Sequence, residues 1–200
     1  MTIANLHRDI ETDLILLRAA MPTTAPAMAR GTTVVLRDGS MVLIRQVQAA
    51  DAPLVADGFA RLSADSRATR CLGAKKELFP AELRYLTEVD HHDHEALGAL
   101  EHPGGPGVGI ARYIRYSGDP EAAEIAVTVV DDWQGRGLGT ELIRQLSGCA
   151  WRAGIRRFTA VATADNVAAV RLLRTMSAQP VRREAGAAEY EITLEPGGKS

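Results

Sequence analysis

The sequence lacks the features that mark several large classes of protein. Its 200 residues include only two cysteines, far apart and outside any Cys-x-x-Cys spacing, so neither a disulfide framework nor a structural zinc site is expected. A net charge of −2 gives no reason to expect a nucleic acid or a membrane surface as a partner. No apolar run approaches the roughly 18 residues of a membrane span, and the N-terminal residues lack a secretory pattern. These absences predict a globular protein of a reducing cytoplasm.

The composition is otherwise that of one ordinary globular domain with a short extension. Hydrophobic residues make up 46% of the chain and charged residues 24%, and 200 residues are enough to bury one substantial core. Residues 1–30 are interpreted as an N-terminal appendage, either a short amphipathic helix or a disordered segment, that ends in a stretch rich in Pro, Ala and Thr. We therefore expect one folded domain over residues 31–196.

Strand and helix patterns alternate from residue 31 onward. Apolar residues alternate on both sides of Asp38-Gly39, which predicts a hairpin, and Asp51 is placed to cap a helix. Residues 61–89 carry a helical pattern that is broken at Phe79-Pro80. Further strands are expected over residues 95–100, 108–116, 124–130 and 157–162, a helix from Leu138 to near Gly154, another from Asn166, and a closing hairpin over 181–194. This mixture predicts an α/β or α+β fold with a mixed sheet flanked by helices.

A glycine-rich segment, residues 134–140, separates an apolar strand pattern from an amphipathic helix pattern. It is not a dinucleotide fingerprint, because Thr140 stands where the third glycine would be and no acidic residue closes the next strand. It is not a Walker A loop, because no lysine follows the glycines. Glycines let a backbone approach an anion closely, and N–H groups at a helix start bind phosphates, so we expect a pyrophosphate there. The alternative is a plain strand-to-helix turn whose glycines serve tight packing.

This segment, Q-G-R-G-L-G-T, resembles the acetyl-CoA pyrophosphate loop of the GNAT family of N-acetyltransferases, written Q/R-x-x-G-x-G/A. Residues 123–130 before it resemble the family's fourth strand, and residues 165–176 resemble its last helix. The similarity covers about residues 33–194, and at 61–67, 85–97 and 123–134 it resembles the catalytic domain of bacterial protein-lysine acetyltransferases of the mycobacterial Pat type. The resemblance implies the GNAT fold, in which a mostly antiparallel sheet is splayed between its two central strands, and acetyl-CoA as co-substrate without a metal.

Glu124 is the candidate general base. A lysine amine with a pKa near 10.4 is protonated at neutral pH, and Glu124 follows Ala122 and Ala123 in an apolar strand where burial tends to raise the pKa of a carboxyl. In lysine-acetylating GNATs the glutamate at the matching strand position is the base, often acting through water. The alternative is a solvated strand-edge glutamate that pairs with an arginine such as Arg112.

The resemblance also implies which residues bind acetyl-CoA. Backbone groups of the strand would hold the pantetheine arm and polarise the thioester carbonyl, and the loop would bind the pyrophosphate. The residues so assigned are Val127, Thr128 and Val129 on the strand, Gln134, Gly135, Arg136, Gly137, Leu138, Gly139 and Thr140 in the loop, and Asn166 at the start of the last helix. Many GNATs carry a tyrosine in that helix that protonates the departing thiolate, but Leu173 stands there in this chain, which leaves water, Tyr113 or Tyr116 for that role.

The cluster of His91, His92 and His94 is not expected to bind a metal, because ligands so close in sequence rarely converge on one ion. We expect it to line the acceptor entrance instead. The sequence as a whole predicts an acetyl-CoA-dependent N-acetyltransferase of protein lysines, with acyl-CoA synthetases as the targets that the resemblance suggests. A small amine or a protein N-terminus as acceptor, and a non-catalytic acyl-CoA-binding module, stay open as alternatives.

Overall fold

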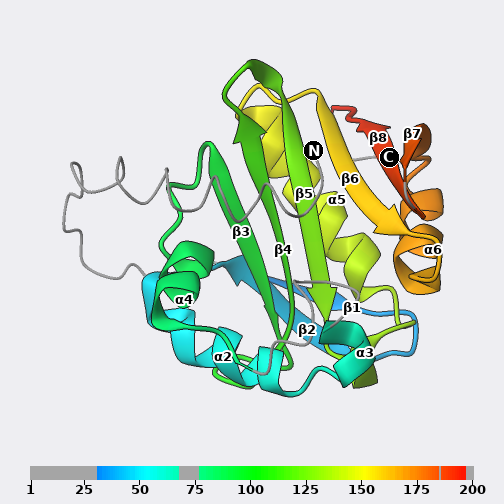
Figure 1. Cartoon of the computed structure of the whole chain (residues 1–200). Coiled ribbons are helices and arrows are strands. Elements are labelled where there is room, and N and C mark those ends of the chain that lie inside the picture. The colour runs from blue at the N-terminus through cyan, green and yellow to red at the C-terminus, as the bar shows by residue number, and fades with distance from the viewer. Residues whose placement is uncertain (1–30, 68–76, 185, 197–200) are drawn as a thin grey trace.

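An eight-stranded sheet organises the residues that the computed structural model describes, which are 31–67, 77–184 and 186–196 (Figure 1). The strands lie in the order β1-β2-β3-β4-β5-β6-β8-β7, and every neighbouring pair is antiparallel except β5 and β6. They are β1 (Thr32–Val35), β2 (Met41–Gln46), β3 (His94–Leu100), β4 (Gly107–Tyr116), β5 (Asp119–Val129), β6 (Arg157–Thr163), β7 (Gln179–Glu184) and β8 (Ala187–Thr193). The predicted mixed sheet and its closing hairpin are confirmed.

Helices cover both faces of this sheet. They are the 3-10 helices η2 (Ala49–Asp51) and η4 (Asp131–Trp133) and the α-helices α2 (Ala52–Ala60), α3 (Ala64–Arg67), α4 (Pro80–Thr87), α5 (Leu138–Arg152) and α6 (Val167–Thr175). Helix α5 packs against β3, β4 and β5, whereas α2 packs against β4 and α4. In Figure 1, α5 lies behind these strands, and α2 and α4 lie in front of them. Helix α6 contacts both β6 and α5.

The main core lies between the sheet and α5. The predicted apolar stripe of α5 is confirmed, because Leu138, Leu142 and Leu146 are buried along one side of the helix. They share a cluster of buried side chains with Tyr113 of β4 and Phe158 of β6, whose ring centroids lie 5.9 Å apart. Removal of this apolar surface from water is the main force that holds α5 against the sheet.

The side chains of β4 alternate between this core and the opposite face of the sheet. Ala111 and Tyr113 belong to the buried cluster, whereas Ile110, Arg112 and Ile114 line a cavity. Successive side chains of a strand point to opposite faces, so one strand both anchors the core and contributes to the cavity.

Asp51 lies at the N-cap position of α2, as predicted, but its carboxylate does not cap that helix. The two carboxylate oxygens accept hydrogen bonds from Arg45 at 2.6 and 2.7 Å, and one of them also accepts from the backbone N–H of Gln48 at 2.8 Å. Burial alone would raise the pKa of Asp51, but these hydrogen bonds hold it below its usual value. The residue therefore ties β2 to the start of α2.

Some sequence expectations concern residues without a described structure. The appendage expected over residues 1–30 lies outside the described residues. Of the helical pattern expected over 61–89, α3 and α4 are described, and residues 68–76 between them are not. Among the described helices, none is both long and apolar enough to cross a bilayer.

Candidate active site

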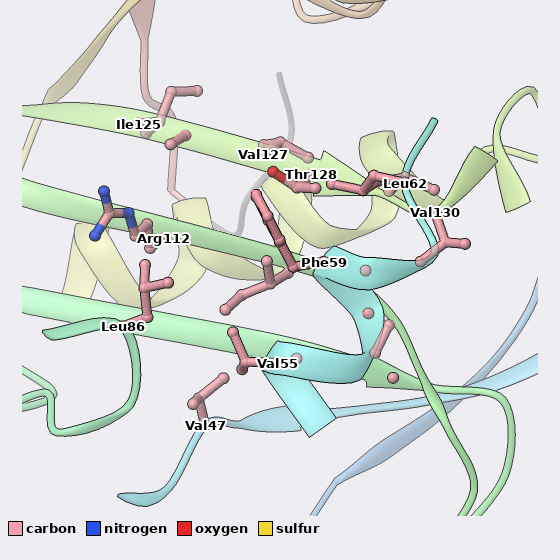
Figure 2. A pocket seen from close by; sticks show the side chains of 18 of the residues that line it. Val47, Val55, Phe59, Leu62, Leu86, Arg112, Ile125, Val127, Thr128 and Val130 are labelled. Carbon is pink, nitrogen blue, oxygen red and sulfur yellow. The ribbon is translucent and has the colours of Figure 1, made fainter. Parts of the chain in front are cut away.

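A cavity of about 340 Å³ lies on the face of the sheet that carries α2 and α4 (Figure 2). Strands β4 and β5 line it along the sheet, α2 and α4 line one side, and β6 and α6 line the other. Most of the lining side chains are apolar, and those labelled around α2 in Figure 2 include Val55, Phe59 and Leu62. The volume falls within the range of roughly 300–1,000 Å³ that is typical of pockets for small molecules and cofactors.

The cavity continues between β5 and β6, where these parallel strands separate. They are paired only through residues 122–124 and 157–159, whereas β4 and β5 are paired along almost their whole length. Beyond residue 124, both strands line the cavity, with residues 125–129 of β5 and 160–162 of β6. In the described part of the chain, no other strand pairs with that edge of β5. The expected splay between the two central strands is therefore confirmed.

Glu124 lies at the point where the two strands begin to separate. It is the last residue of β5 that is paired with β6, opposite Thr159, and it lines the cavity. Its side chain is exposed to the cavity, but the surrounding walls exclude part of the water that would otherwise solvate the carboxylate. This desolvation raises its pKa; the positive charge of Arg112 opposes the shift and the negative charge of Glu189 adds to it. A carboxylate with a raised pKa is suited to accept a proton at neutral pH.

Arg112 of β4 lines the same cavity (Figure 2), but no ion pair joins it to Glu124. Its guanidinium lies 5.0 Å from the ring centroid of Tyr85 in α4. Its Nη1 is buried and has no hydrogen-bond partner among the described residues. The ring of His94 also packs against Tyr85, with centroids 5.3 Å apart, and burial lowers the pKa of His94 to about 4. Arg112 therefore acts on Glu124 through its charge and not as a paired partner.

The glycine loop, residues 134–140, leads from η4 into α5. Gly135 and Gly137 have φ angles of 76° and 93°, in the left-handed region that residues with a Cβ rarely adopt. Gly137 is the N-cap of α5 and offers no side chain to cap it. The backbone N–H groups of residues 135–140 have no hydrogen-bond acceptor among the described residues. Open N–H donors at the positive end of a helix dipole fit a pyrophosphate.

The polar side chains of the glycine loop hold its shape. Gln134 donates a hydrogen bond to the carboxylate of Asp131 at 2.7 Å. Arg136 forms an ion pair with Asp38 at 3.1 Å and donates to the backbone carbonyl of Asp132 at 2.6 Å. Backbone groups, more than these side chains, are therefore the part of the loop that is open to an anion.

Helix α6 contributes a polar cap and an apolar surface. The side chain of Asn166 accepts a hydrogen bond from the backbone N–H of Ala169 at 3.0 Å, which caps the helix, and Asn166 also lines the cavity. Leu173, which stands where many GNATs have a tyrosine, is 4% exposed and lines the cavity as well. This helix therefore offers no hydroxyl at that position.

The two tyrosines considered as replacements have different surroundings. Tyr113 is buried on the α5 side, where its hydroxyl donates to the backbone carbonyl of His92 at 2.9 Å and burial raises its pKa. Tyr116 is 36% exposed, and its hydroxyl shares a hydrogen bond of 2.6 Å with Thr159, the residue paired with Glu124. Of the two, only Tyr116 lies near Glu124.

The histidine cluster is held by local contacts. His91 lies 2.7 Å from the buried carboxylate of Glu95, and His92 lies 2.8 Å from Asp93. Within the described residues, no group of three or more His, Cys, Asp or Glu side chains is arranged to hold a metal ion. Among the described histidines, none lines the cavity, and His94 contacts the lining residue Tyr85, so a histidine-lined acceptor entrance stays a prediction.

Five of the twelve site residues expected from the sequence meet at this cavity, and residues 134–140 of the glycine loop are not among those that line it. Glu124, Val127, Thr128, Val129 and Asn166 all line it, and the glycine loop follows the end of β5. The sequence did not indicate the opposite wall, which is formed by Leu54, Val55, Phe59, Tyr85 and Leu86, or the contribution of residues 160–162. The apolar helical spacing of α2 and α4 was the one available signal, and such spacing predicts burial without indicating what the face lies against.

Comparison with known proteins gives consistent similarities. A family model described as the acetyltransferase (GNAT) domain matches residues 42–179. The acetyltransferase Pat of Mycolicibacterium smegmatis is 32% identical over 161 residues, which are 80% of this chain and 48% of Pat, so the chain spans about half the length of that relative. Acetyltransferase PA5475 of Pseudomonas aeruginosa is 39% identical over 133 residues, which are 66% of this chain and 71% of that protein. The crystal structure of the GNAT domain of S. lividans PAT has a TM-score of 0.77 and 28% identity, over 86% of this chain and 100% of that domain.

Proposed function

Because the chain belongs to the GNAT family of acetyltransferases, we propose that it transfers the acetyl group of acetyl-CoA to lysine side chains of cytoplasmic proteins, with Glu124 as general base. The observation that carries the proposal is the position of Glu124 in the cavity wall, at the splay between β5 and β6, with a raised pKa. Acetyl-CoA is the co-substrate of the family. The resemblance to Pat-type enzymes supports a lysine acceptor and acyl-CoA synthetases as targets.

The role of Glu124 is to make the target amine nucleophilic. Deprotonation of a lysine with a pKa near 10.4 costs roughly 4–5 kcal/mol at neutral pH. Glu124 accepts this proton, directly or through one water, as the amine nitrogen bonds to the acetyl carbon and the carbon–sulfur bond breaks. That proton then passes to solvent. The nitrogen loses a second proton as the amide forms, and this release balances the proton that the departing thiolate takes up.

Two backbone surfaces would bind different parts of acetyl-CoA. The edge of β5 at Val127, Thr128 and Val129 would hold the pantetheine arm and polarise the thioester carbonyl, as the family resemblance implies, beside the space that opens where β5 and β6 separate beyond residue 124. The open N–H groups of the glycine loop would bind the pyrophosphate. Asn166 would keep the start of α6 in place beside the cavity.

Leu173 leaves the departing thiolate without the family's usual acid. A thiol with a pKa of about 8.5 is a good leaving group, so protonation of the thiolate is the least demanding part of the reaction. Water fulfils this role, or Tyr116, which lies beside Glu124 and is partly exposed.

The acceptor class is tested by incubating the purified protein with isotopically labelled acetyl-CoA and a host lysate, then mapping the label by mass spectrometry. Label on protein lysines that is lost in Glu124→Gln supports the proposal. The matched control is Glu121→Gln, which makes the same change three residues away on β5 at a position outside the cavity. Label only on polyamines, other small amines or protein N-termini would overturn the lysine assignment. Tight acetyl-CoA binding without transfer to any amine would instead indicate a non-catalytic module.

A further inference from the structure

The turn between β1 and β2, residues 36–40, packs directly against the glycine loop. The backbone N–H of Arg37 donates to the carbonyl of Arg136 at 3.1 Å, and Asp38 forms the ion pair with Arg136 described above. The side chain of Arg37 lies across Gly137: a Cβ built on that glycine would be 3.3 Å from Nε and 3.4 Å from Cγ and Cδ of Arg37. The hairpin at the β1 edge of the sheet and the loop near its centre therefore form one surface.

The two arginines at this surface, Arg37 and Arg136, differ in whether described residues pair with their guanidinium groups. Arg136, the cation within the loop, is occupied by Asp38 and by the carbonyl of Asp132, and its guanidinium lies 4.7 Å from the ring centroid of Trp133. Arg37 is exposed, and its side chain forms no ion pair or hydrogen bond with any described residue. The ion pair with Asp38 thus neutralises the loop's own arginine, and Arg37 is left as the uncompensated positive charge on the loop.

We propose that Arg37 is a phosphate-binding residue of the cofactor site, contributed by the β1–β2 turn and not by the glycine loop itself. This inference rests on the proposed function, because it takes the phosphate groups of coenzyme A as the ligand. A guanidinium is planar, keeps its charge and offers paired N–H donors that match phosphate oxygens. Arg37 would add this charge to the open backbone N–H groups of residues 135–140.

The surrounding residues explain why Arg37 lies at this place. The Asp38–Arg136 ion pair and the Arg37 N–H hydrogen bond hold the backbone of the turn against the loop, which places the stem of Arg37 beside Gly137. Gly137 provides the space for the stem, because any larger residue would place a Cβ in close contact with it. The pyrophosphate and the 3′-phosphate of coenzyme A share the chemistry that Arg37 would recognise.

Isothermal titration calorimetry with coenzyme A and with 3′-dephospho-coenzyme A tests this inference without any measurement of catalysis. We expect Arg37→Gln to weaken coenzyme A binding roughly tenfold or more, and to make its affinity less sensitive to salt, because a charge-assisted hydrogen bond is lost. Arg37→Lys keeps the charge and should retain part of the affinity. The matched control is Arg183→Gln on β7, which removes one exposed arginine at the opposite edge of the sheet and should leave affinity unchanged. An equal loss for both ligands assigns Arg37 to the pyrophosphate, and a loss seen only with coenzyme A assigns it to the 3′-phosphate.

Three results would overturn the inference. If Arg37→Gln binds coenzyme A like the wild type while Gly137→Asp does not bind it, the loop binds the cofactor without Arg37 and only this inference fails. If Arg37→Gln and Arg37→Lys lose the same affinity and both lower the melting temperature relative to Arg183→Gln, Arg37 only holds the turn in place. If the wild type has no measurable affinity for coenzyme A, the proposed function fails as well.

Discussion

Replacement of Glu124 by glutamine keeps the size of the side chain and removes the carboxylate that the proposed mechanism requires. Glu124 lies on a strand that is paired on both sides at this point, so an isosteric amide should leave β5 in place. The pyrophosphate is expected to bind at the glycine loop, beyond the other end of the strand, so affinity for coenzyme A should stay within about twofold of the wild type. The change therefore tests proton transfer separately from cofactor binding.

The expected loss follows from the chemistry of the acceptor. A positioned general base contributes about 10²–10⁴-fold to the rate, so kcat/KM for the lysine acceptor should fall by a factor in that range near neutral pH. Without the base, only free amine reacts, and the rate of the variant should rise about tenfold per pH unit below the lysine pKa near 10.4. The wild-type rate should level off once pH exceeds the pKa of Glu124, which burial raises above its usual value.

The assay follows thiol release from acetyl-CoA with a lysine peptide over a range of pH, with the acetylated product confirmed by mass spectrometry. Glu121→Gln, on the same strand but outside the cavity, should behave like the wild type. A Glu124→Gln enzyme that keeps the wild-type rate and pH profile, with unchanged coenzyme A affinity, would refute the assignment of Glu124 as the base.

Three other substitutions test the site and the core. Arg112→Gln removes the positive charge that lowers the pKa of Glu124, so this pKa should rise and the acidic limb of the kcat/KM profile should move to higher pH; an unmoved limb would show that another group sets it. Gly137→Asp places a Cβ at a φ of 93° and a carboxylate beside the expected phosphates, so calorimetry should show coenzyme A affinity reduced by at least tenfold, and unchanged affinity would place the phosphate site elsewhere. Phe158→Ala empties a position that is 0% exposed, so denaturant unfolding should show a loss of about 3–5 kcal/mol, whereas a loss below about 1 kcal/mol would contradict the described packing.

Local sequence patterns predicted those helices and strands whose formation depends on residues close together in the chain. The stripe of α5 follows from apolar spacing at the helical period, and the β1–β2 hairpin follows from Asp38-Gly39, where Gly39 has a φ of 84°. Asn166 caps α6 with its own side chain, as its place before an apolar helix indicates. Asp51 was correctly predicted to lie at a helix start, but its hydrogen bonds to Arg45 were not predicted. Arg45 lies on another element, and the helix-start pattern does not include it.

The candidate site was predictable along the strand and the loop that carry motifs, and at Asn166, which begins the last helix. Residues 124–129 and 134–140 are close in sequence, so a family resemblance covers both at once. The wall formed by α2 and α4 has no motif, since any apolar side chains of suitable size can form such a surface. The contact of Arg37 with Gly137 joins residues 100 positions apart, and only the fold brings them together.

The sequence by itself determined the family, the order of the elements and the glycine loop, because each depends on residue types at fixed spacing along the chain. Tertiary structure decided which strands separate and which charged groups pair, because both depend on the distance between elements. It separated β5 from β6 just beyond Glu124, left Arg112 beside that carboxyl without an ion pair, and set Asp38 against Arg136 so that Arg37 is left over the glycine loop. Charge and burial act through space, and the distances that set their strength exist only once the chain has folded.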